Sequence, residues 1–455
     1  MTLHYAFSRY IYWPLTQTIK GEYAFRALNE LSESQWNSQE EIEDKQWQLV
    51  RRTVTKAAQE VPYYREAYAR AGWDFRNRDF SYQDFLTLPK LEKEDMRDRV
   101  SELLNPNYYG SVTTGTTSGS TGQSLKMYYT TEHESYSEGA RWRAKGWWGV
   151  EPGCPQLVLW GRPYSGTRDR LTQRVKSYGL NTRLFSAFDI REASLQRMWK
   201  TISRFEPKII YGYPSGIFAL AEFLRRNRIA ADNLGLNVIM ITAEASTVVQ
   251  RTLIEEVFGA QTANEYGCSE TGGFVYECSH GSWHISSELT FIEFLRPDGT
   301  PVSEGEAGEV FLTHLRNDYM PLIRYRVGDL GSPLSGTCSC GRGLPRMGIS
   351  VCKENDVIRL ANGETYMSGD LNYISKTVMA EYPSSILQFR VRQKAVDIFE
   401  IEIIPGVQRV DRAEARFSQL MKEFLGNDID VQLKRVPYIE RERSGKLRYF
   451  VSDLP

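Results

Sequence analysis

The sequence lacks any long hydrophobic run and any excess of one charge. No apolar stretch among its 455 residues is long enough to span a bilayer, and 56 Lys and Arg residues balance 57 Asp and Glu residues. We therefore expect neither an integral membrane segment nor a nucleic-acid partner. Hydrophobic residues are 41% and charged residues 25% of the chain, which indicates a globular protein of about two to four domains rather than a disordered chain.

The N-terminal segment also lacks the features of a secretory signal. Its apolar stretch is interrupted at Arg9, and no small-residue cleavage site follows, so a cytoplasmic location is the simplest interpretation. A membrane surface is an alternative environment for this segment, and the residues that would contact it are Tyr5, Phe7, Tyr10, Ile11 and Trp13. Because the basic face is thin, we favour a helix packed on the main domain.

Cysteine is scarce, and in a cytosolic chain of this size six cysteines do not indicate a disulfide framework. The spacings Cys278-x5-His284 and Cys338-x-Cys340 would give three thiolates and one imidazole, the closed tetrahedral set of a structural zinc site. His280 competes with His284 as the imidazole ligand. The alternative is three reduced cysteines packed as small hydrophobic side chains.

The distribution of apolar residues predicts an α/β protein. The first hundred residues have helical periodicity, and from about residue 110 short apolar strands alternate with helices, which favours a parallel sheet. Residues 285–330 are strand-rich and predict an antiparallel or barrel-like subdomain. A large N-terminal domain of several subdomains over residues 1–352 and a small α+β C-terminal domain over 353–455 follow from a boundary near residues 351–356.

The strongest motif is a run of Thr, Ser and Gly that is followed by a lysine. Small residues let backbone N–H groups turn toward an anion, while hydroxyls and an ammonium add donors and charge, so a polyphosphate is the expected guest. The alternative is a flexible surface loop. The residues concerned are Thr117, Ser118, Gly119, Ser120, Thr121, Gly122 and Lys126.

Three weaker motifs follow along the chain. In the segment NEYGCSE, a tyrosine face can stack on a purine, a serine can meet a phosphate oxygen and a glutamate can hold Mg²⁺. Asp329 can accept both hydroxyls of a ribose, and Lys446 can bring a point charge to a carboxylate or phosphate. Taken singly, they read as an ordinary Tyr-Gly turn, a surface salt bridge and a solvated basic tail.

Together and in this order, the motifs resemble those of the ANL superfamily of adenylate-forming enzymes, over most of the chain. The resemblance is to the phenylacetate-CoA ligase branch and its relatives in capsular-polysaccharide clusters. The segments that carry it are TTSGSTGQSLK, YGYPSGIFALAEFL, ITAEA, EYGCSETGG, PLIRYRVGDLG, CSCGR and SGK.

This resemblance implies ATP-dependent activation of a small carboxylic acid as an acyl-adenylate, with release of pyrophosphate and transfer of the acyl group to CoA. Transfer to an amine or hydroxyl of a polysaccharide precursor or natural product is the alternative. The implied cofactors are ATP, Mg²⁺, a structural Zn²⁺ and, for the transfer step, CoA. The identity of the acid and the oligomeric state stay open.

The resemblance also assigns roles to single residues. The Thr117–Gly122 run with Lys126 would cover the β- and γ-phosphates, and Ser269 would meet the α-phosphate. Catalysis would need Glu270 for Mg²⁺ and Lys446 to bridge the carboxylate and the α-phosphate. The remaining contacts implied are Ala243, Glu244 and Tyr266 at the adenine, Asp329 at the ribose, and Tyr211, Tyr213 and Gly267 at the acyl group.

The hinge before the C-terminal domain departs from the pattern of the family. Lys353 stands where many relatives carry a phosphate-contacting arginine, and Asn355 occupies the hinge position. A lysine lacks the bidentate fork of an arginine. The departure weakens the case for the thioester half-reaction more than the case for adenylation.

Overall fold

The computed structural model describes most of the chain. The described residues are 2–73, 81–116, 125–161, 167–187, 189–353, 357–363, 365–367, 371–382, 385–440 and 448–454. Within them, no helix combines the length and apolarity that a membrane crossing requires.

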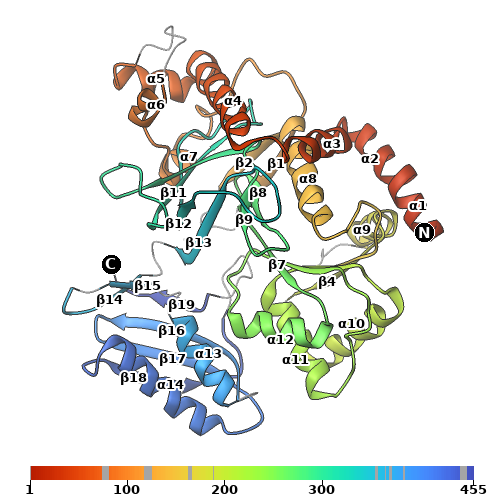
Figure 1. Cartoon of the computed structure of the whole chain (residues 1–455), viewed down its shortest axis with the longest axis vertical. Coiled ribbons are helices and arrows are strands. Elements are labelled where there is room, and N and C mark those ends of the chain that lie inside the picture. Colours follow the sequence, from red (N-terminus) through yellow and green to blue (C-terminus); the bar gives the residue numbers. More distant parts are fainter. Residues whose placement is uncertain are drawn as a thin grey trace.

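Helices form the first hundred residues, which confirms the prediction from periodicity (Figure 1). Ser38 accepts a hydrogen bond from the backbone of Glu41 and the Glu41 side chain returns one to Ser38, so a capping box begins α4. Pro62 begins α5, where its missing N–H is not needed. The bounds are α1 Leu3–Phe7, a π-helical turn η1 Ser8–Tyr12, α2 Trp13–Lys20, α3 Ala24–Ser34, α4 Gln39–Glu60, α5 Pro62–Arg70, α6 Tyr82–Thr87 and α7 Lys93–Asp98.

A single mixed sheet forms the centre of the molecule, with the order β10-β11-β12-β13-β9-β8-β7-β6-β5-β3-β4 among the described residues. Strands β3 to β7 pair in parallel, and the strands from β8 onward pair antiparallel. The bounds are β3 Gln156–Trp160, β4 Thr182–Ser186, β5 Ile209–Gly212, β6 Val238–Thr242, β7 Thr262–Cys268, β8 Gly272–Glu277, β9 Trp283–Ile285, β10 Thr290–Leu295, β11 Gly308–His314, β12 Tyr325–Leu334 and β13 Arg346–Lys353.

The strand-rich segment is antiparallel, as predicted, but it does not form a barrel or a sheet of its own. The β7–β8 hairpin reverses the chain, with a register shift between Tyr266 and Gly267, and the antiparallel strands extend the parallel half of the same sheet. A separate two-stranded hairpin, β1 Val112–Thr116 with β2 Lys126–Thr130, flanks residues 117–124.

Helices cover both faces of the parallel half of the sheet. Because side chains alternate along a strand, Val238 and Met240 pack toward α3 and α8, whereas Ile239 and Ile241 pack toward α10, α11 and α12. A strand buried on both faces is typical of a parallel sheet. The bounds are α8 Thr131–Gly146, α9 Thr167–Gly179, α10 Glu192–Phe205, α11 Pro214–Arg226 and α12 Val248–Phe258.

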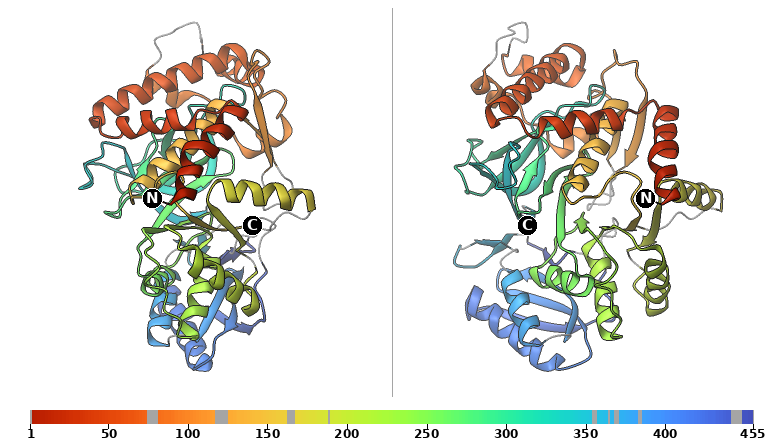
Figure 2. Two further views of the ribbon diagram at one scale, coloured as in Figure 1. Left: turned by 90° about the vertical axis from the view of Figure 1, so that its right-hand side faces the viewer. Right: turned by 45° about the vertical axis from the view of Figure 1, so that its right-hand side comes forward.

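The C-terminal part has its own four-stranded sheet, ordered β18-β17-β16-β19, and its own hydrophobic core (Figures 1 and 2). Gln250 at the start of α12 donates to the Tyr449 hydroxyl, which joins this part to the rest. The bounds are β14 Val357–Arg359, β15 Thr365–Met367, α13 Leu371–Glu381, β16 Ile386–Ala395, β17 Ile398–Pro405, α14 Val410–Leu425, β18 Asp430–Arg435 and β19 Phe450–Ser452.

Candidate active site and metal centre

Several of the predicted site residues lie at or near the carboxyl ends of the parallel strands. Tyr211 is on β5, Ala243 directly follows β6 and Tyr266 is on β7, so the parallel register brings them to one edge of the sheet. This edge is the usual place for a ligand in an open α/β sheet. We therefore take it as the candidate active site.

Strands β7 and β12 are joined there by a tyrosine and a carboxylate. The Tyr266 hydroxyl donates to Oδ2 of Asp329 at 2.9 Å. Burial, followed by the Asp329 carboxylate, raises the pKa of Tyr266 well above its ordinary value, so the hydroxyl keeps its proton and remains a donor. The residues predicted for the adenine and the ribose are thus in direct contact.

A second tyrosine–carboxylate pair runs in the opposite direction between the same strands. The Tyr325 hydroxyl on β12 donates to Oε1 of Glu270 at 2.9 Å, just beyond the end of β7. Glu270 is buried, and burial followed by this carboxylate raises the pKa of Tyr325. One oxygen of Glu270 is therefore fixed by the protein, and the carboxylate offers a hard oxygen ligand of the kind that Mg²⁺ prefers.

A tight turn presents the residues between these pairs. A Cβ on Gly267 would lie 2.1 Å from the carbonyl oxygen of Gly272, so only glycine allows β8 to approach so closely. Ser269 follows this point with an exposed side chain, and its carbonyl oxygen accepts a hydrogen bond from the Tyr129 hydroxyl at 2.6 Å. Through Tyr129, the β1–β2 hairpin is held against the turn.

That hairpin carries the predicted phosphate loop. Residues Thr117–Gly122 lie outside the described part of the chain, whereas Lys126 is the first residue of β2. Lys126 is exposed, and its Nζ lies 5.1 Å from the centre of the Tyr128 ring. The structure therefore shows where the loop begins and ends but not the residues predicted to contact phosphates.

The adenine-edge residues sit between β6 and α11. Ala243 has a positive φ of 69°, which turns the chain sharply after the strand. Glu244 follows, and its Oε2 accepts a hydrogen bond from the backbone N–H of Ser215 at 3.2 Å. The helix dipole favours a carboxylate at the first turn of α11. Glu244, at the position predicted for the adenine edge, therefore also stabilises the start of this helix.

Two further predicted residues belong to the C-terminal part or to its border. Lys446 lies outside the described residues. Lys353 is the last residue of β13, where its backbone pairs with that of Asp329. The hinge position Asn355 also lies outside the described residues.

The predicted acyl side contains an aromatic stack that the sequence interpretation did not include. Trp160, at the end of β3, stacks on Tyr211 with ring centres 5.7 Å apart and on Tyr213 with ring centres 4.8 Å apart. Trp160 is 38% exposed, whereas Tyr213 is buried. The sequence signal for Trp160 is its position, because it is the last apolar residue of the run CPQLVLWG and stands directly before a glycine.

Beneath this stack lies a buried polar network that the sequence interpretation also missed. The Tyr211 hydroxyl donates to Oε1 of Glu265 at 2.8 Å, and Oε2 of Glu265 lies 3.7 Å from Nε of Arg141. Lys145 donates to Gln156 at 2.8 Å, and burial lowers its pKa to about 8, although Glu138 acts in the opposite direction. Arg141, Lys145 and Glu138 come from α8, so no local pattern could reveal that they meet β5 and β7.

The cysteines and one histidine form a compact cluster at β8 and β9. The possible ligand atoms of Cys278, His284, Cys338 and Cys340 all lie within 4.8 Å of one another. Sγ of Cys278 is 3.8 Å from Sγ of Cys338, and Sγ of Cys340 is 3.3 Å from Nε2 of His284. Three thiols and one imidazole in this arrangement suit a tetrahedral zinc ion.

The choice between the two histidines follows from the geometry. Nδ1 of His284 lies 3.2 Å from the carbonyl oxygen of Leu344, so with Nδ1 as the donor Nε2 is left to face the thiols. His280 is exposed, and its ring contacts the Ser279 hydroxyl instead. His284 is therefore the imidazole of the cluster.

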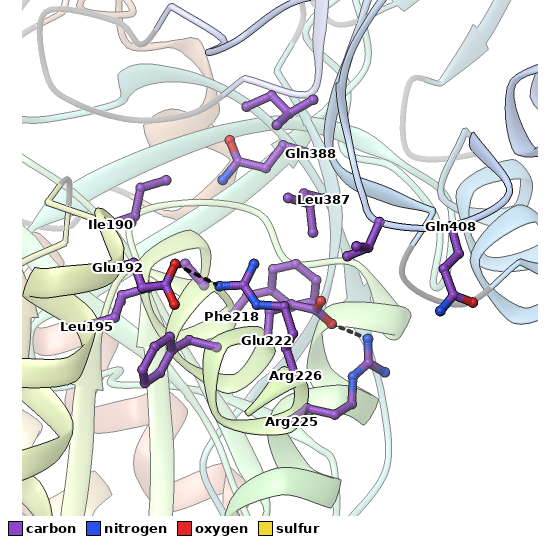
Figure 3. A pocket seen from close by; sticks show the side chains of 14 residues that line it. Ile190, Glu192, Leu195, Phe218, Glu222, Arg225, Arg226, Leu387, Gln388 and Gln408 are labelled. Atoms are coloured by element: carbon purple, nitrogen blue, oxygen red, sulfur yellow. Dashed lines mark hydrogen bonds and ion pairs between the residues drawn. The ribbon is translucent and has the colours of Figure 1, made fainter. Parts of the chain in front are cut away.

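A cavity of about 430 Å³ lies where the C-terminal part meets α10 and α11 (Figure 3). Its walls are apolar at Phe218 and Leu387, and its rim carries an ion pair of Glu192 with Arg226 at 3.6 Å. None of the predicted site residues that the structure describes lines it. It marks an incompletely packed junction rather than the candidate active site.

Comparisons with known proteins agree with the geometry. No protein-family model matches the chain. It is 25% identical to the phenylacetate-coenzyme A ligase of Thermus thermophilus over 90% of this chain and 96% of that protein. It is also 25% identical to the indoleacetate–lysine synthetase of Pseudomonas savastanoi, over 55% of this chain and 61% of that protein. These similarities agree with the resemblance of the sequence motifs to the phenylacetate-CoA ligase branch of the adenylate-forming enzymes.

Solved structures show the same fold. A crystal structure of 2-hydroxyisobutyryl-CoA ligase in the postadenylation state matches with a TM-score of 0.70, at 19% identity, over 89% of this chain and 88% of that chain. The predicted α/β fold class is confirmed.

Proposed function

We propose that the chain activates a carboxylic acid with ATP and Mg²⁺ as an acyl-adenylate, releasing pyrophosphate, and then transfers the acyl group to CoA. The observation that carries this proposal is the pair of tyrosine–carboxylate contacts, Tyr266 with Asp329 and Tyr325 with Glu270, at the carboxyl edge of the sheet. They fix two acidic groups side by side in a chain that is similar to a phenylacetate-coenzyme A ligase over 90% of its length.

The chemistry explains why these groups are needed. A carboxylate that attacks an α-phosphate is an anion approaching an anion, so the protein must position the reactants and compensate negative charge. In the proposal Glu270 holds Mg²⁺, which supplies positive charge at the phosphates. Asp329 orients the ribose, and Tyr266 lies against the adenine.

The positive charge on the acyl side is assigned to Lys446. We propose that residues 353–455 form a mobile domain that carries this lysine to the site for adenylation and away from it for transfer. The separate core of the C-terminal part and the cavity of about 430 Å³ at its junction with α11 support such movement, because an interface with a void is easier to leave than a packed one.

Pyrophosphate exchange into ATP, measured with a panel of carboxylic acids, tests the adenylation step. We expect exchange that depends on one class of acid and that Lys446→Ala lowers by about 100-fold or more. Lys434→Ala, on β18, is the matched control and should leave exchange unchanged. Exchange that is the same in Lys446→Ala and wild type would remove the proposed role of this lysine.

An amine acceptor is the second candidate, and two observations favour it. The chain is similar to an indoleacetate–lysine synthetase, and Lys353 replaces the arginine that many relatives use toward phosphate. Incubating the preformed adenylate with CoA or with lysine separates the two. Rapid release of AMP with CoA supports the ligase, whereas release with the amine alone supports the synthetase.

For the cysteine cluster we propose one structural Zn²⁺ per chain, held by Cys278, His284, Cys338 and Cys340. The Leu344 carbonyl would orient the imidazole by accepting a hydrogen bond from Nδ1 of His284. The cluster also ties distant segments together, because the backbone N–H of Gly343 donates to the Gln35 carbonyl at 3.0 Å, between α3 and α4. We further propose a cytoplasmic location, where ATP and CoA are supplied and thiols stay reduced.

A further inference from the structure

The N-terminal helical segment presents a row of apolar side chains to solvent. Leu3, Phe7, Ile11, Leu15 and Ile19 recur every four residues and are 93%, 36%, 57%, 54% and 74% exposed. The 18 residues from Leu3 to Lys20 form a rod about 27 Å long. A continuous apolar row of this length is far more than the scattered exposed residues of an ordinary surface.

The opposite side of the same segment is fixed to the body of the protein. Tyr5 and Arg9 both contact Oε2 of Glu151, at 2.9 Å each. Trp13 is buried, with its ring centre 4.1 Å from Phe25 and 5.4 Å from Trp142. The favoured packing of this segment on the main domain is confirmed. Of the residues named for the membrane alternative, Tyr5 and Trp13 face the body of the protein instead.

The π-helical turn helps to keep the row on one side. In an α-helix each step of four residues advances about 40° beyond a full turn, so a row at this spacing drifts around the helix. The wider turn at Ser8–Tyr12 needs more residues per turn and offsets part of that drift. The π turn therefore lies where it brings the two halves of the apolar row into line.

A helix with exposed basic residues, α9, borders the N-terminal segment, and the sequence alone could not place it there. Helix α9 lies against α1, because the rings of His4 and Tyr178 stack 4.5 Å apart and Nε2 of His4 is 2.7 Å from the Tyr178 carbonyl oxygen (Figure 2). The α9 residues Arg174 and Lys176 are exposed, as is the apolar Val175 between them.

The charge around the row is positive on balance. Residues 2–21 contain Arg9 and Lys20 but no Asp or Glu, and the α9 sequence contains one acidic residue, Asp169, against four basic residues, Arg168, Arg170, Arg174 and Lys176. Arg9 and Lys20 are paired with Glu151 and Glu22, so α9 supplies the excess. Two copies of this positively charged surface would repel each other. A surface with anionic groups above an apolar layer would attract it.

We propose that α1, η1, α2 and α9 form a docking surface for an anionic lipid bilayer, on which the chain lies without crossing it. The apolar row enters the boundary between headgroups and acyl chains, and Arg174 and Lys176 meet the anionic headgroups. The proposal is independent of the adenylation chemistry, because none of these residues belongs to the candidate active site.

Co-sedimentation of the full chain with phosphatidylcholine vesicles, with and without phosphatidylglycerol, tests the proposal. We expect binding that is stronger with phosphatidylglycerol and that Ile11→Ser/Leu15→Ser lowers at least about tenfold. Arg174→Gln/Lys176→Gln should remove the preference for phosphatidylglycerol, at about fivefold per charge. Leu334→Ser/Tyr438→Ser, which changes exposed residues elsewhere, is the matched control and should bind as wild type does.

Two controls make the outcome decisive. Unchanged pyrophosphate exchange, or unchanged circular dichroism if there is no exchange, shows that each variant folds. Wild type that stays in the supernatant with both kinds of vesicle overturns the proposal. So does a dimer in sedimentation velocity that Ile11→Ser/Leu15→Ser converts to monomer without any vesicle binding, since the row would then be an interface between two copies.

Discussion

At the candidate active site each acidic group is held by one tyrosine from another strand, whereas at the cysteine cluster four donor atoms already lie within 4.8 Å of one another. The tyrosine–carboxylate pairs lie on β7 and β12, and the cysteine cluster lies beside β8 and β9. The cluster brings together all four side chains that are proposed to hold a metal ion. The active site, by contrast, has a fixed half on β7 and β12 and depends on Lys446 and the Thr117–Gly122 run for the rest of its proposed contacts.

From this difference we expect the cysteine cluster to contribute to stability and the tyrosine–carboxylate pairs to contribute to catalysis. A preformed set of ligands favours one arrangement of the chain and therefore contributes to folding. A site whose charges come from separate segments can change its composition between two half-reactions. Changes at the cluster should therefore affect the folded state, and changes at the tyrosine–carboxylate pairs should affect the reaction.

The largest effect is expected for Glu270→Gln. The amide keeps the size of the side chain but removes the charge proposed to hold Mg²⁺, so pyrophosphate exchange should fall on the order of 100- to 1,000-fold while the melting temperature changes little. Glu43→Gln, at an exposed position of α4, is the control. A variant that exchanges normally would show that Glu270 has no part in catalysis.

Cys338→Ser should have the reverse profile. We expect zinc analysis to find one ion per chain in wild type and none in the variant, together with a loss of several kcal/mol of stability in denaturant unfolding. Folded variant protein should still carry out exchange. Cys154→Ser removes a thiol outside the cluster, and equal metal contents in all three proteins would contradict the assignment.

A smaller effect is expected when the tyrosine rather than the carboxylate is changed. Tyr325→Phe removes one hydrogen bond to Glu270, so exchange should fall about tenfold and need more Mg²⁺ for half-maximal rate. Tyr64→Phe is the matched control, because its buried hydroxyl donates to the Pro321 carbonyl instead. If both variants behave alike, the Tyr325 contact is structural only.

The smallest effect concerns pH and the stack beneath the β1–β2 hairpin. His133 lies between Tyr129 and His314, with ring centres 4.7 and 4.6 Å away, and burial, with a smaller contribution from Arg141, lowers its pKa from 6.5 to about 3. As the pH falls, the unfolded chain takes up a proton at His133 before the folded chain does. The stability that the neutral His133 ring contributes is therefore present above pH 6.5 and is lost as the pH falls toward 3.

The slope of stability against pH measures this contribution. Replacing His133 with Gln should reduce the slope below pH 6.5 by at most about 1.4 kcal/mol per pH unit, while His314 still contributes in the same direction. His280→Gln, at an exposed position, should leave the slope unchanged. An unchanged slope in His133→Gln would show that this ring is protonated equally in the folded and unfolded chain.

Local patterns were sufficient for the elements. Helical periodicity predicts α4, with Pro62 as its breaker, and apolar runs predict β5 and β6. These predictions are confirmed, because each depends on residues close together in the chain. The structure brings Tyr266 and Glu270 to one edge of the sheet, and the roles that the motif order assigns to them stay predictions.

Long-range packing was not predictable in the same way. The joining of the antiparallel strands to the parallel sheet depends on the β7–β8 hairpin register, which no composition reveals. Trp160 lies at the predicted acyl side because β3 pairs with β5. Arg141 lies near it because α8 packs across the sheet. The sequence likewise did not show that α9 lies beside α1. This placement brings the α9 residues Arg174 and Lys176 near the N-terminal segment, whose own basic face is thin.

The most direct test of the account is detection of the acyl-adenylate itself. Wild type, Glu270→Gln and Cys338→Ser are each incubated with ATP, Mg²⁺ and a mixture of carboxylic acids, quenched and analysed by mass spectrometry. The account predicts an acyl-AMP with wild type and with folded Cys338→Ser, and none above background with Glu270→Gln. Cleavage of ATP to ADP and phosphate, or an adenylate formed equally by all three proteins, would contradict it.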